Sequence, residues 1–271
     1  MVTFPKSKIN LGLRITGKRE DGYHDIETIF YPVGLCDALE IVLNLGGNED
    51  HLTVTGINST DLSQDNMVLT AVRKLRGLFD LPSLKIHLHK MIPSGAGLGG
   101  GSSDAASTIR LINRFFDLSM NSSEMREIAL TIGSDCPFFI DSTPSYATGR
   151  GERLQSVEVS MDKMHIVLLN RGISVSTREA YSRCVPGIPA IKLTDAVRKP
   201  IYEWNEALIN DFEKTVFSRY PEIKALRDGL YKAGAAFSSM SGSGSTVYGI
   251  FSQRPELGED LNKYLIFEGQ L

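Results

Sequence analysis

Residues 93–104 read PSGAGLGGGSSD, and this glycine-rich stretch decides how the rest of the sequence is interpreted. Five of its twelve positions are glycine. The preceding residues 84–90, LKIHLHK, alternate as a half-buried strand does, whereas apolar residues from Ala105 to Ile112 repeat at helical spacing. A glycine turn between a strand and a helix N-terminus exposes backbone N–H groups, and the helix dipole adds to them. The pattern therefore predicts a binding site for phosphate.

Two other glycine motifs match parts of the sequence, but each lacks a feature that its function requires. Gly95, Gly97 and Gly100 satisfy the dinucleotide fingerprint G-x-G-x-x-G, which must continue through a helix into a parallel strand. Here a second helix follows instead, because Asn121 and Glu124 form a capping-box pattern. The stretch GLRITGKR at 12–19 has the P-loop glycines and lysine but carries arginine where Mg²⁺ needs a hydroxyl.

A flexible surface loop is the structural alternative for the glycine cluster. Ser102, Ser103 and Asp104 count against it, because they stand at the expected start of the helix. Hydroxyl groups at that place can bond to phosphate or to Mg²⁺. Phosphate binding is thus the favoured interpretation.

The N-terminal stretch KINLGLRI, residues 8–15, alternates strictly between apolar and polar residues. Lys8 and Asn10 consequently share one face of a predicted strand. Asp135 lies in GSDCPFF, a polar break before an apolar segment. Taken alone, the lysine fits a solvated strand face and the aspartate fits a helix N-cap.

The remaining pattern mixes both kinds of element, which indicates an α+β protein with two domains. A dip in apolar content around 146–156 places the boundary near residue 155, giving domains 1–155 and 156–271. Strands are expected at 38–45, 51–56 and 165–170, a helix capped by Asp65 or Asn66, mainly helices over 176–233, and a hairpin over 235–251.

Composition narrows the class of protein. The 29 basic and 32 acidic residues give a formal charge of −3, which favours neither a nucleic-acid nor a membrane partner. Cys36, Cys136 and Cys184 are widely spaced, as reduced thiols in a cytoplasmic protein would be. His87 and His89 share a strand face, but two exposed histidines without a third ligand do not indicate a metal site.

PSGAGLGGGSSDAAS resembles the ATP-binding loop of the GHMP kinase superfamily. MSGSGSTVYG at 240–249 and FPKSKINLGL at 4–13 resemble its C-terminal and N-terminal motifs. With GKREDGYHDIET at 17–28 and IGSDCPFF at 132–139, the match narrows to the branch whose acceptor is a cytidine diphosphate derivative of methylerythritol. The resemblance implies an N-terminal domain like domain 2 of ribosomal protein S5 and a C-terminal ferredoxin-like α/β sandwich domain.

The resemblance also implies roles for single residues. ATP would be the phosphate donor with Mg²⁺ as cofactor, Lys8 and Asp135 would be catalytic, and Ser103 is the candidate metal ligand. The acceptor would contact Asn10, Tyr23, His24, Gly242 and Gly244, with the Tyr23 ring stacked on the pyrimidine. The expected ATP contacts are Asn66, Lys90, Pro93, Ser94, Gly95, Ala96, Gly97, Leu98, Gly99, Gly100, Gly101, Ser102 and Ser103.

Three alternatives remain open at this point. The chain could be another GHMP kinase, acting on mevalonate, homoserine or a sugar, but Tyr23 and His24 favour an acceptor with a pyrimidine. It could be a non-catalytic nucleotide-binding protein, which would be expected to lack Lys8 or Asp135. A dinucleotide-dependent oxidoreductase is the weakest. The expected assembly is a monomer or a weak homodimer, and ATP and acceptor are expected to meet between the domains.

Overall fold

The computed structural model describes residues 1–57, 66–181, 184–187 and 191–271, which form two compact units. Unit 1 is Met1–Ser7, Leu35–Ser94 and Gly99–Thr143, and unit 2 is Lys8–Gly34, Gly95–Leu98 and Pro144–Leu271. The units are therefore interleaved along the chain, and their last boundary falls after Thr143 rather than at the expected residue 155. Strand pairing is the reason, because residues 26–30 pair with 145–149. The division into domains 1–155 and 156–271 stays a prediction.

Unit 1 is built on a four-stranded sheet in the order β1-β4-β6-β5. Its strands are β1 (Val2–Thr3), β4 (Ala38–Leu43), β5 (His51–Gly56) and β6 (Leu84–Lys90). β6 pairs antiparallel with β4 and parallel with β5. Along β6 every second residue from Leu84 is buried, and this buried row ends at Lys90. A lysine thus occupies the last core-facing position of the strand that leads into the glycine loop.

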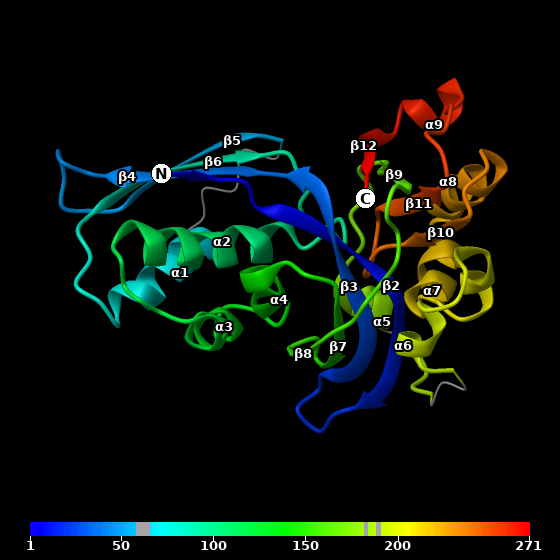
Figure 1. Cartoon of the computed structure of the whole chain (residues 1–271), viewed down its shortest axis with the longest axis horizontal. Helices are drawn as coiled ribbons and strands as arrows, with labels where there is room; N and C mark the ends of the chain where they lie inside the picture. Colours follow the sequence, from blue (N-terminus) through cyan, green and yellow to red (C-terminus); the bar gives the residue numbers. More distant parts are fainter. Residues whose placement is uncertain (58–65, 182–183, 188–190) are drawn as a thin grey trace. The chain divides into compact units, whose positions relative to one another are not determined.

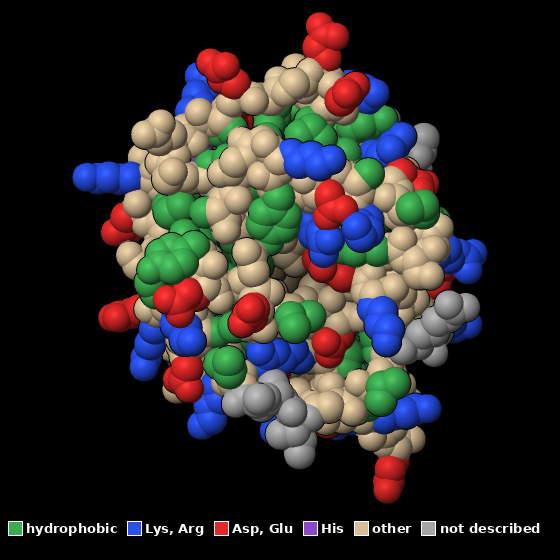
Figure 2. Space-filling view, turned by 90° about the vertical axis from the view of Figure 1, so that its right-hand side faces the viewer, with side chains coloured by type: hydrophobic (Ala, Val, Ile, Leu, Met, Phe, Trp, Pro, Cys, Tyr) green, Lys and Arg blue, Asp and Glu red, His purple; other side chains and the backbone are tan. Residues whose placement is uncertain are grey.

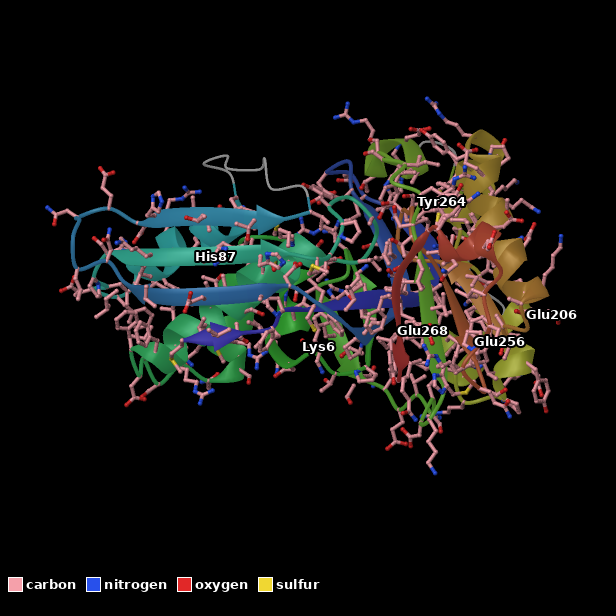
Figure 3. The ribbon with its side chains drawn as sticks, turned by 90° about the horizontal axis from the view of Figure 1, so that it is seen from above. Lys6, His87, Glu206, Glu256, Tyr264 and Glu268 are labelled. Carbon is pink, nitrogen blue, oxygen red and sulfur yellow. The ribbon has the colours of Figure 1, made fainter. Side chains whose placement is uncertain are left out.

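The helices of unit 1 are α1 (Met67–Arg76), α2 (Gly100–Phe115), α3 (Ser122–Leu130) and α4 (Cys136–Asp141). α1 and α2 pack together and cover one face of the sheet (Figure 1). α2 also contacts α3 and α4. Figure 3 looks onto the face of the sheet that the helices leave open, where His87 is labelled.

Unit 2 contains two further sheets of four strands. One has the order β2-β3-β7-β8, with β2 (Lys6–Lys18), β3 (His24–Cys36), β7 (Ser145–Gly149) and β8 (Arg153–Ser156). The other has the order β10-β11-β9-β12, with β9 (His165–Leu169), β10 (Phe237–Met240), β11 (Val247–Phe251) and β12 (Leu265–Gln270). All pairs of the second sheet are antiparallel. The first residues of β2, up to Ser7, and the last residues of β3, from Leu35, belong to unit 1.

Short helices complete unit 2: α5 (Thr177–Tyr181), α6 (Leu193–Ala196), the 3₁₀ helix η1 (Ile201–Glu206), α7 (Phe212–Arg219), α8 (Pro221–Lys232) and α9 (Glu259–Asn262). α8 packs against β10 and β11, and Pro221 stands at its first turn as predicted. Leu13 and Ile15 of β2 join Val167, Leu226 and Val247 in one buried apolar cluster. This core holds β2, the strand that carries Lys8 and Asn10, in place.

The strands over 8–15, 38–45, 51–56, 84–90 and 165–170 and the C-terminal hairpin are confirmed to within a few residues. Asn66 caps α1 as predicted, while Asp65, the other candidate cap, lies outside the described residues. The capping box at Asn121 is also present. The strands β3, β7, β8 and β12 had no clear signal in the sequence.

No helix among the described residues is long and apolar enough to cross a membrane. Figure 2 shows one face of the molecule, on which acidic and basic side chains are interspersed rather than gathered by sign. The three cysteines are free thiols.

Candidate functional site

Lys8 and Asn10 lie together on β2, and both are buried, with exposed fractions of 4% and 1%. The alternation of β2 predicted a polar face. The polar side chains of Lys8 and Asn10 on that face contact other polar groups of the protein rather than solvent. The Lys8 ammonium donates to Asn10 Oδ1 at 2.7 Å and to the carbonyl oxygen of Gly97 at 3.1 Å. It also lies 5.0 Å from the ring centroid of Phe30. A buried ammonium is costly unless it is hydrogen-bonded, and these contacts satisfy that need.

The first half of the glycine loop packs against the C-terminal glycine motif. Ser241 Oγ donates to the carbonyl oxygen of Gly97 at 2.8 Å, and Thr246 N donates to Ala96 O at 3.2 Å. Gly97 has φ of +78°, and a Cβ there would lie 1.9 Å from Ser241 O. Only glycine fits this position. Within unit 2 the structure thus brings together residues from three motifs that are far apart in sequence.

The turn between β10 and β11 is hydrogen-bonded to Asn210, a side chain that the sequence did not single out. Asn210 donates to Met240 O at 2.8 Å and to Gly242 O at 2.9 Å, and its own oxygen accepts from Phe212 N. Gly242 and Gly244 both have positive φ. Asn210 therefore fixes the backbone of the turn whose glycines were predicted to contact the acceptor.

Aromatic side chains gather around Tyr23 and His24 in unit 2. Tyr23 is 56% exposed, and the Arg150 guanidinium lies 5.0 Å from its ring centroid. The His24 ring stacks on Tyr181 with centroids 4.6 Å apart. Exposed rings of this kind can stack on a planar base. Neither Arg150 nor Tyr181 carried a sequence signal, because their neighbours in space are remote in sequence.

The second half of the glycine loop opens α2 in unit 1. Gly99 is its N-cap in the left-handed conformation and offers no side-chain cap hydrogen bond. Glycine has no side chain that could cap the first N–H groups of α2, and the helix dipole favours an anion at that end. Ser102 is half-buried and Ser103 is buried in the first turn. Pro93 and Ser94 lead into the loop from the same unit.

Asp135 precedes α4, also in unit 1. It occupies the N-cap position, yet its carboxylate makes no cap hydrogen bond, so the capping interpretation does not describe its side chain. Its neighbour Cys136 has a thiol hydrogen-bonded to Ser102, and burial raises the pKa of this thiol to about 12. Added Cβ atoms at Gly101 and Gly133 would both touch Met67. The Asp135 segment therefore packs against the first turn of α2.

Asn66 and Lys90 were both predicted to contact nucleotide. Asn66 Oδ1 accepts from Val68 N at 2.9 Å and so caps α1. The Lys90 side chain is only 8% exposed, and its ammonium is paired with Asp37 and Asp104. Asp104 stands within the loop sequence, but nothing in the sequence linked Asp37 to the loop or either aspartate to Lys90.

The donor atoms near the loop suit Mg²⁺. Among the described residues no group of three or more His, Cys, Asp or Glu side chains could hold a metal by itself. The hydroxyls of Ser102 and Ser103 and the Asp135 carboxylate are hard oxygen donors, the type that Mg²⁺ binds together with substrate phosphates. His87 Nε2 and His89 Nδ1 instead share the Thr55 hydroxyl, at 2.8 and 2.9 Å.

The chain is similar to known proteins over its whole length. The family model for the GHMP kinases N terminal domain matches residues 66–143, and that for the GHMP kinases C terminal matches residues 190–266. The chain is 45% identical to 4-diphosphocytidyl-2-C-methyl-D-erythritol kinase of Parabacteroides distasonis over 100% of both chains.

Many solved structures share the fold, among them the following two. A crystal structure of 4-(cytidine 5'-diphospho)-2C-methyl-D-erythritol kinase is 30% identical, with a TM-score of 0.74 over 92% of this chain and 90% of the other. Mevalonate kinase of Methanococcus jannaschii is 14% identical, with a TM-score of 0.64 over 97% and 92%. The second similarity concerns the fold alone.

Proposed function

The chain belongs to the 4-diphosphocytidyl-2-C-methyl-D-erythritol kinases of the GHMP kinase superfamily, and we propose how its own residues carry out the reaction of that family. The enzyme transfers the γ-phosphate of ATP to the C2 hydroxyl of 4-(cytidine 5'-diphospho)-2-C-methyl-D-erythritol. The products are the 2-phosphate and ADP, in non-mevalonate isoprenoid synthesis.

The proposed donor site is the glycine loop from Pro93 to Ser103. Backbone N–H groups at the start of α2 bind the phosphates of ATP, supported by the uncapped helix N-terminus. Ser103, with Ser102 beside it, would hold Mg²⁺ together with the phosphates. When bound, that ion supplies positive charge that neutralises the triphosphate.

Asp135 is proposed to accept the proton of the C2 hydroxyl. The C2 oxygen then bonds to the γ-phosphorus while the bond from that phosphorus to the β,γ-bridging oxygen breaks, and ADP leaves. The carboxylate is suited to this role because it is half-buried at the start of α4, in the same unit as the first turn of α2.

Lys8 is proposed to stabilise the charge that develops on the transferred phosphoryl group. The observation that carries this proposal is its buried ammonium, held on the carbonyl oxygen of Gly97 within the first half of the ATP loop. Burial beside the loop distinguishes Lys8 from the solvated lysines that are usual on strand faces. Asn10 orients the ammonium and is proposed to contact the acceptor.

The cytidine group is proposed to bind at Tyr23 and His24. Tyr23 offers an exposed ring for stacking, and His24 can read the hydrogen-bonding edge of the base. The Tyr181 ring stacks on one face of the His24 ring. Acceptors such as mevalonate or homoserine have no base to stack, so these side chains support the cytidine acceptor over them. Because this one chain supplies all the proposed residues, we also propose a monomer or a weak homodimer.

Asp135→Asn tests the proposed base. The amide cannot accept the hydroxyl proton, so we expect kcat to fall by about 10² or more while binding of a nonhydrolysable ATP analogue persists. Asp141→Asn, at the other end of α4 and partly exposed, is the matched control. A kcat equal to that of the wild type in Asp135→Asn would remove Asp135 from the mechanism.

A further inference from the structure

Lys90 is a buried lysine at the last position of β6. It ends the buried row of β6, directly before the glycine loop, and is 7% exposed. Its ammonium contacts Asp37 and lies 2.6 Å from Asp104 Oδ2. Burial by itself would lower the pKa of Lys90, but the carboxylates of Asp104 and Asp37 outweigh it and raise that pKa. The lysine is thus a charged group enclosed by protein, rather than one extended toward a ligand.

Asp37 connects this ion cluster to the beginning of the loop. Its Oδ1 accepts hydrogen bonds from Met91 N at 2.5 Å and Ile92 N at 2.8 Å, while its Oδ2 pairs with Lys90. Its side chain is fully buried. One carboxylate therefore fixes the two residues through which β6 passes into the loop.

Asp104 and Gly100 connect the same cluster to the end of the loop. Asp104 lies in the first turn of α2 and is 3% exposed. A Cβ at Gly100 would lie 3.3 Å from Lys90 Nζ and 2.9 Å from Ile92 Cγ2, so the first residue of α2 rests directly on the cluster. The Lys90 ammonium thus contacts one aspartate that is bonded to the beginning of the segment 91–99 and another that follows its end.

Burying the charged cluster of Lys90, Asp37 and Asp104 costs desolvation free energy. A buried ion pair often contributes less stability than apolar residues of the same volume, because both charges lose their hydration. Asp104 Oδ1 in addition is buried without a hydrogen-bond partner among the described residues. Stability alone therefore does not explain the arrangement, whose residues stand directly before and after the segment 91–99.

We propose that Asp37 and Asp104 are positioning residues for ATP, which act through Lys90 to fix the two ends of the glycine loop, and that the Lys90 ammonium is not itself a nucleotide ligand. The inference rests on the proposed function only in that the loop binds ATP. Fixing the ends of a loop lowers the entropy that it loses when its N–H groups close around a ligand.

The test is calorimetric titration with a nonhydrolysable ATP analogue and Mg²⁺, without acceptor. Lys90→Met and Asp37→Asn are each expected to weaken binding by about tenfold or more, because the single oxygen of the asparagine amide cannot serve both Lys90 and the N–H groups of Met91 and Ile92. The double variant should bind no more weakly than the weaker single variant, since each breaks the contact between Lys90 and Asp37. Asp104→Ala should weaken binding as well, and Asp104→Asn, which keeps an oxygen for Lys90, should restore most of it. The acceptor-saturated kcat should change little, with the effect appearing in KM for ATP.

Asp50→Asn is the matched control. Asp50 sits at the opposite end of β6, where it likewise accepts from a strand N–H, that of Leu84, and pairs with Arg76. This variant should lose comparable thermal stability but keep its affinity for the analogue. If Asp37→Asn and Asp104→Ala bind the analogue like the wild type while Lys90→Met does not, Lys90 is a direct ligand and the inference is overturned.

Equal loss of affinity in Asp50→Asn would also overturn the inference, because the effect would then follow stability alone. Since the titration contains no acceptor, it is separate from the acceptor assay. An enzyme that binds the analogue but does not phosphorylate the cytidine acceptor would contradict the proposed function and leave this inference standing.

Discussion

The ammonium of Lys8 donates a hydrogen bond to the carbonyl oxygen of Gly97, 89 positions away in the sequence. This contact joins the N-terminal strand to the ATP loop, and the amide nitrogen of Lys8 adds a second bond, to Leu98 O at 3.0 Å. The side chain proposed to neutralise phosphoryl charge is therefore attached to the loop proposed to hold the phosphates.

Removing the Lys8 charge should affect the transition state more than substrate binding. Lys8→Met is expected to lower kcat by about 10² to 10³, since one electrostatic donor is lost where charge develops. Lys6→Met is the control, because Lys6 lies on the same strand but is exposed (Figure 3). Steady-state kinetics with saturating ATP measure the difference. Equal effects of the two substitutions would show that charge on the strand, not the position of Lys8, is what matters.

Loss of the Tyr23 ring should weaken the acceptor alone. Tyr23→Ala is expected to raise KM for the cytidine acceptor, by an amount equivalent to about 1–3 kcal/mol if base stacking is lost, with KM for ATP unchanged. Tyr202→Ala, at another exposed tyrosine, is the control. An unaltered acceptor KM in Tyr23→Ala would place the cytidine elsewhere.

Gly97 and Gly95 should differ in how much stability the protein loses when each is replaced by alanine. Both have positive φ, but a Cβ at Gly97 would collide with Ser241 O, whereas at Gly95 nothing lies within 4 Å. Gly95→Ala should cost about 1–2 kcal/mol of unfolding free energy from backbone strain, and Gly97→Ala clearly more. Thermal unfolding of both variants measures this. A smaller loss for Gly97→Ala would contradict the packing of the two glycine motifs.

Stability should depend on pH through Asp104. Burial raises the pKa of Asp104 from 3.8 to about 8, so near neutral pH Asp104 accepts the Lys90 hydrogen bond as a neutral acid. Between these values the folded protein keeps a proton that the unfolded chain releases, so the free energy of unfolding should decrease as pH rises from about 4 to about 8. Asp104→Asn cannot titrate and should flatten this slope. Unfolding with denaturant across the pH range checks it, and a slope that is identical in the variant would show that Asp104 is not its source.

The sequence predicted what depends on local spacing. Residues 84–90 alternate, Asn121 and Glu124 form a capping box, and Asn66 caps its helix, because each signal lies within one turn or strand. The resemblance supplied Lys8 and Asp135 as candidates. Tyr181, Asn210 and Asp37 could not be predicted, since their importance comes from contacts with His24, Gly242 and Met91 that only the folded chain creates.

The sequence analysis did not predict the burial of Lys8 or Lys90. A lysine in an alternating strand is usually solvated, and its carboxylate or carbonyl partners are not visible in the pattern. For Lys90 the alternation did hold a clue, because it places the residue on the same face as Leu84, Ile86 and Leu88. A charged residue at such a position requires a buried partner.

The most direct measurement is ADP release by the purified protein with ATP, Mg²⁺ and one acceptor at a time: 4-diphosphocytidyl-2-C-methyl-D-erythritol, mevalonate, homoserine, or methylerythritol phosphate without cytidine. We expect turnover with the cytidine derivative and none above background with the other three. Comparable turnover of mevalonate or homoserine, or none with the cytidine compound, would contradict the assignment.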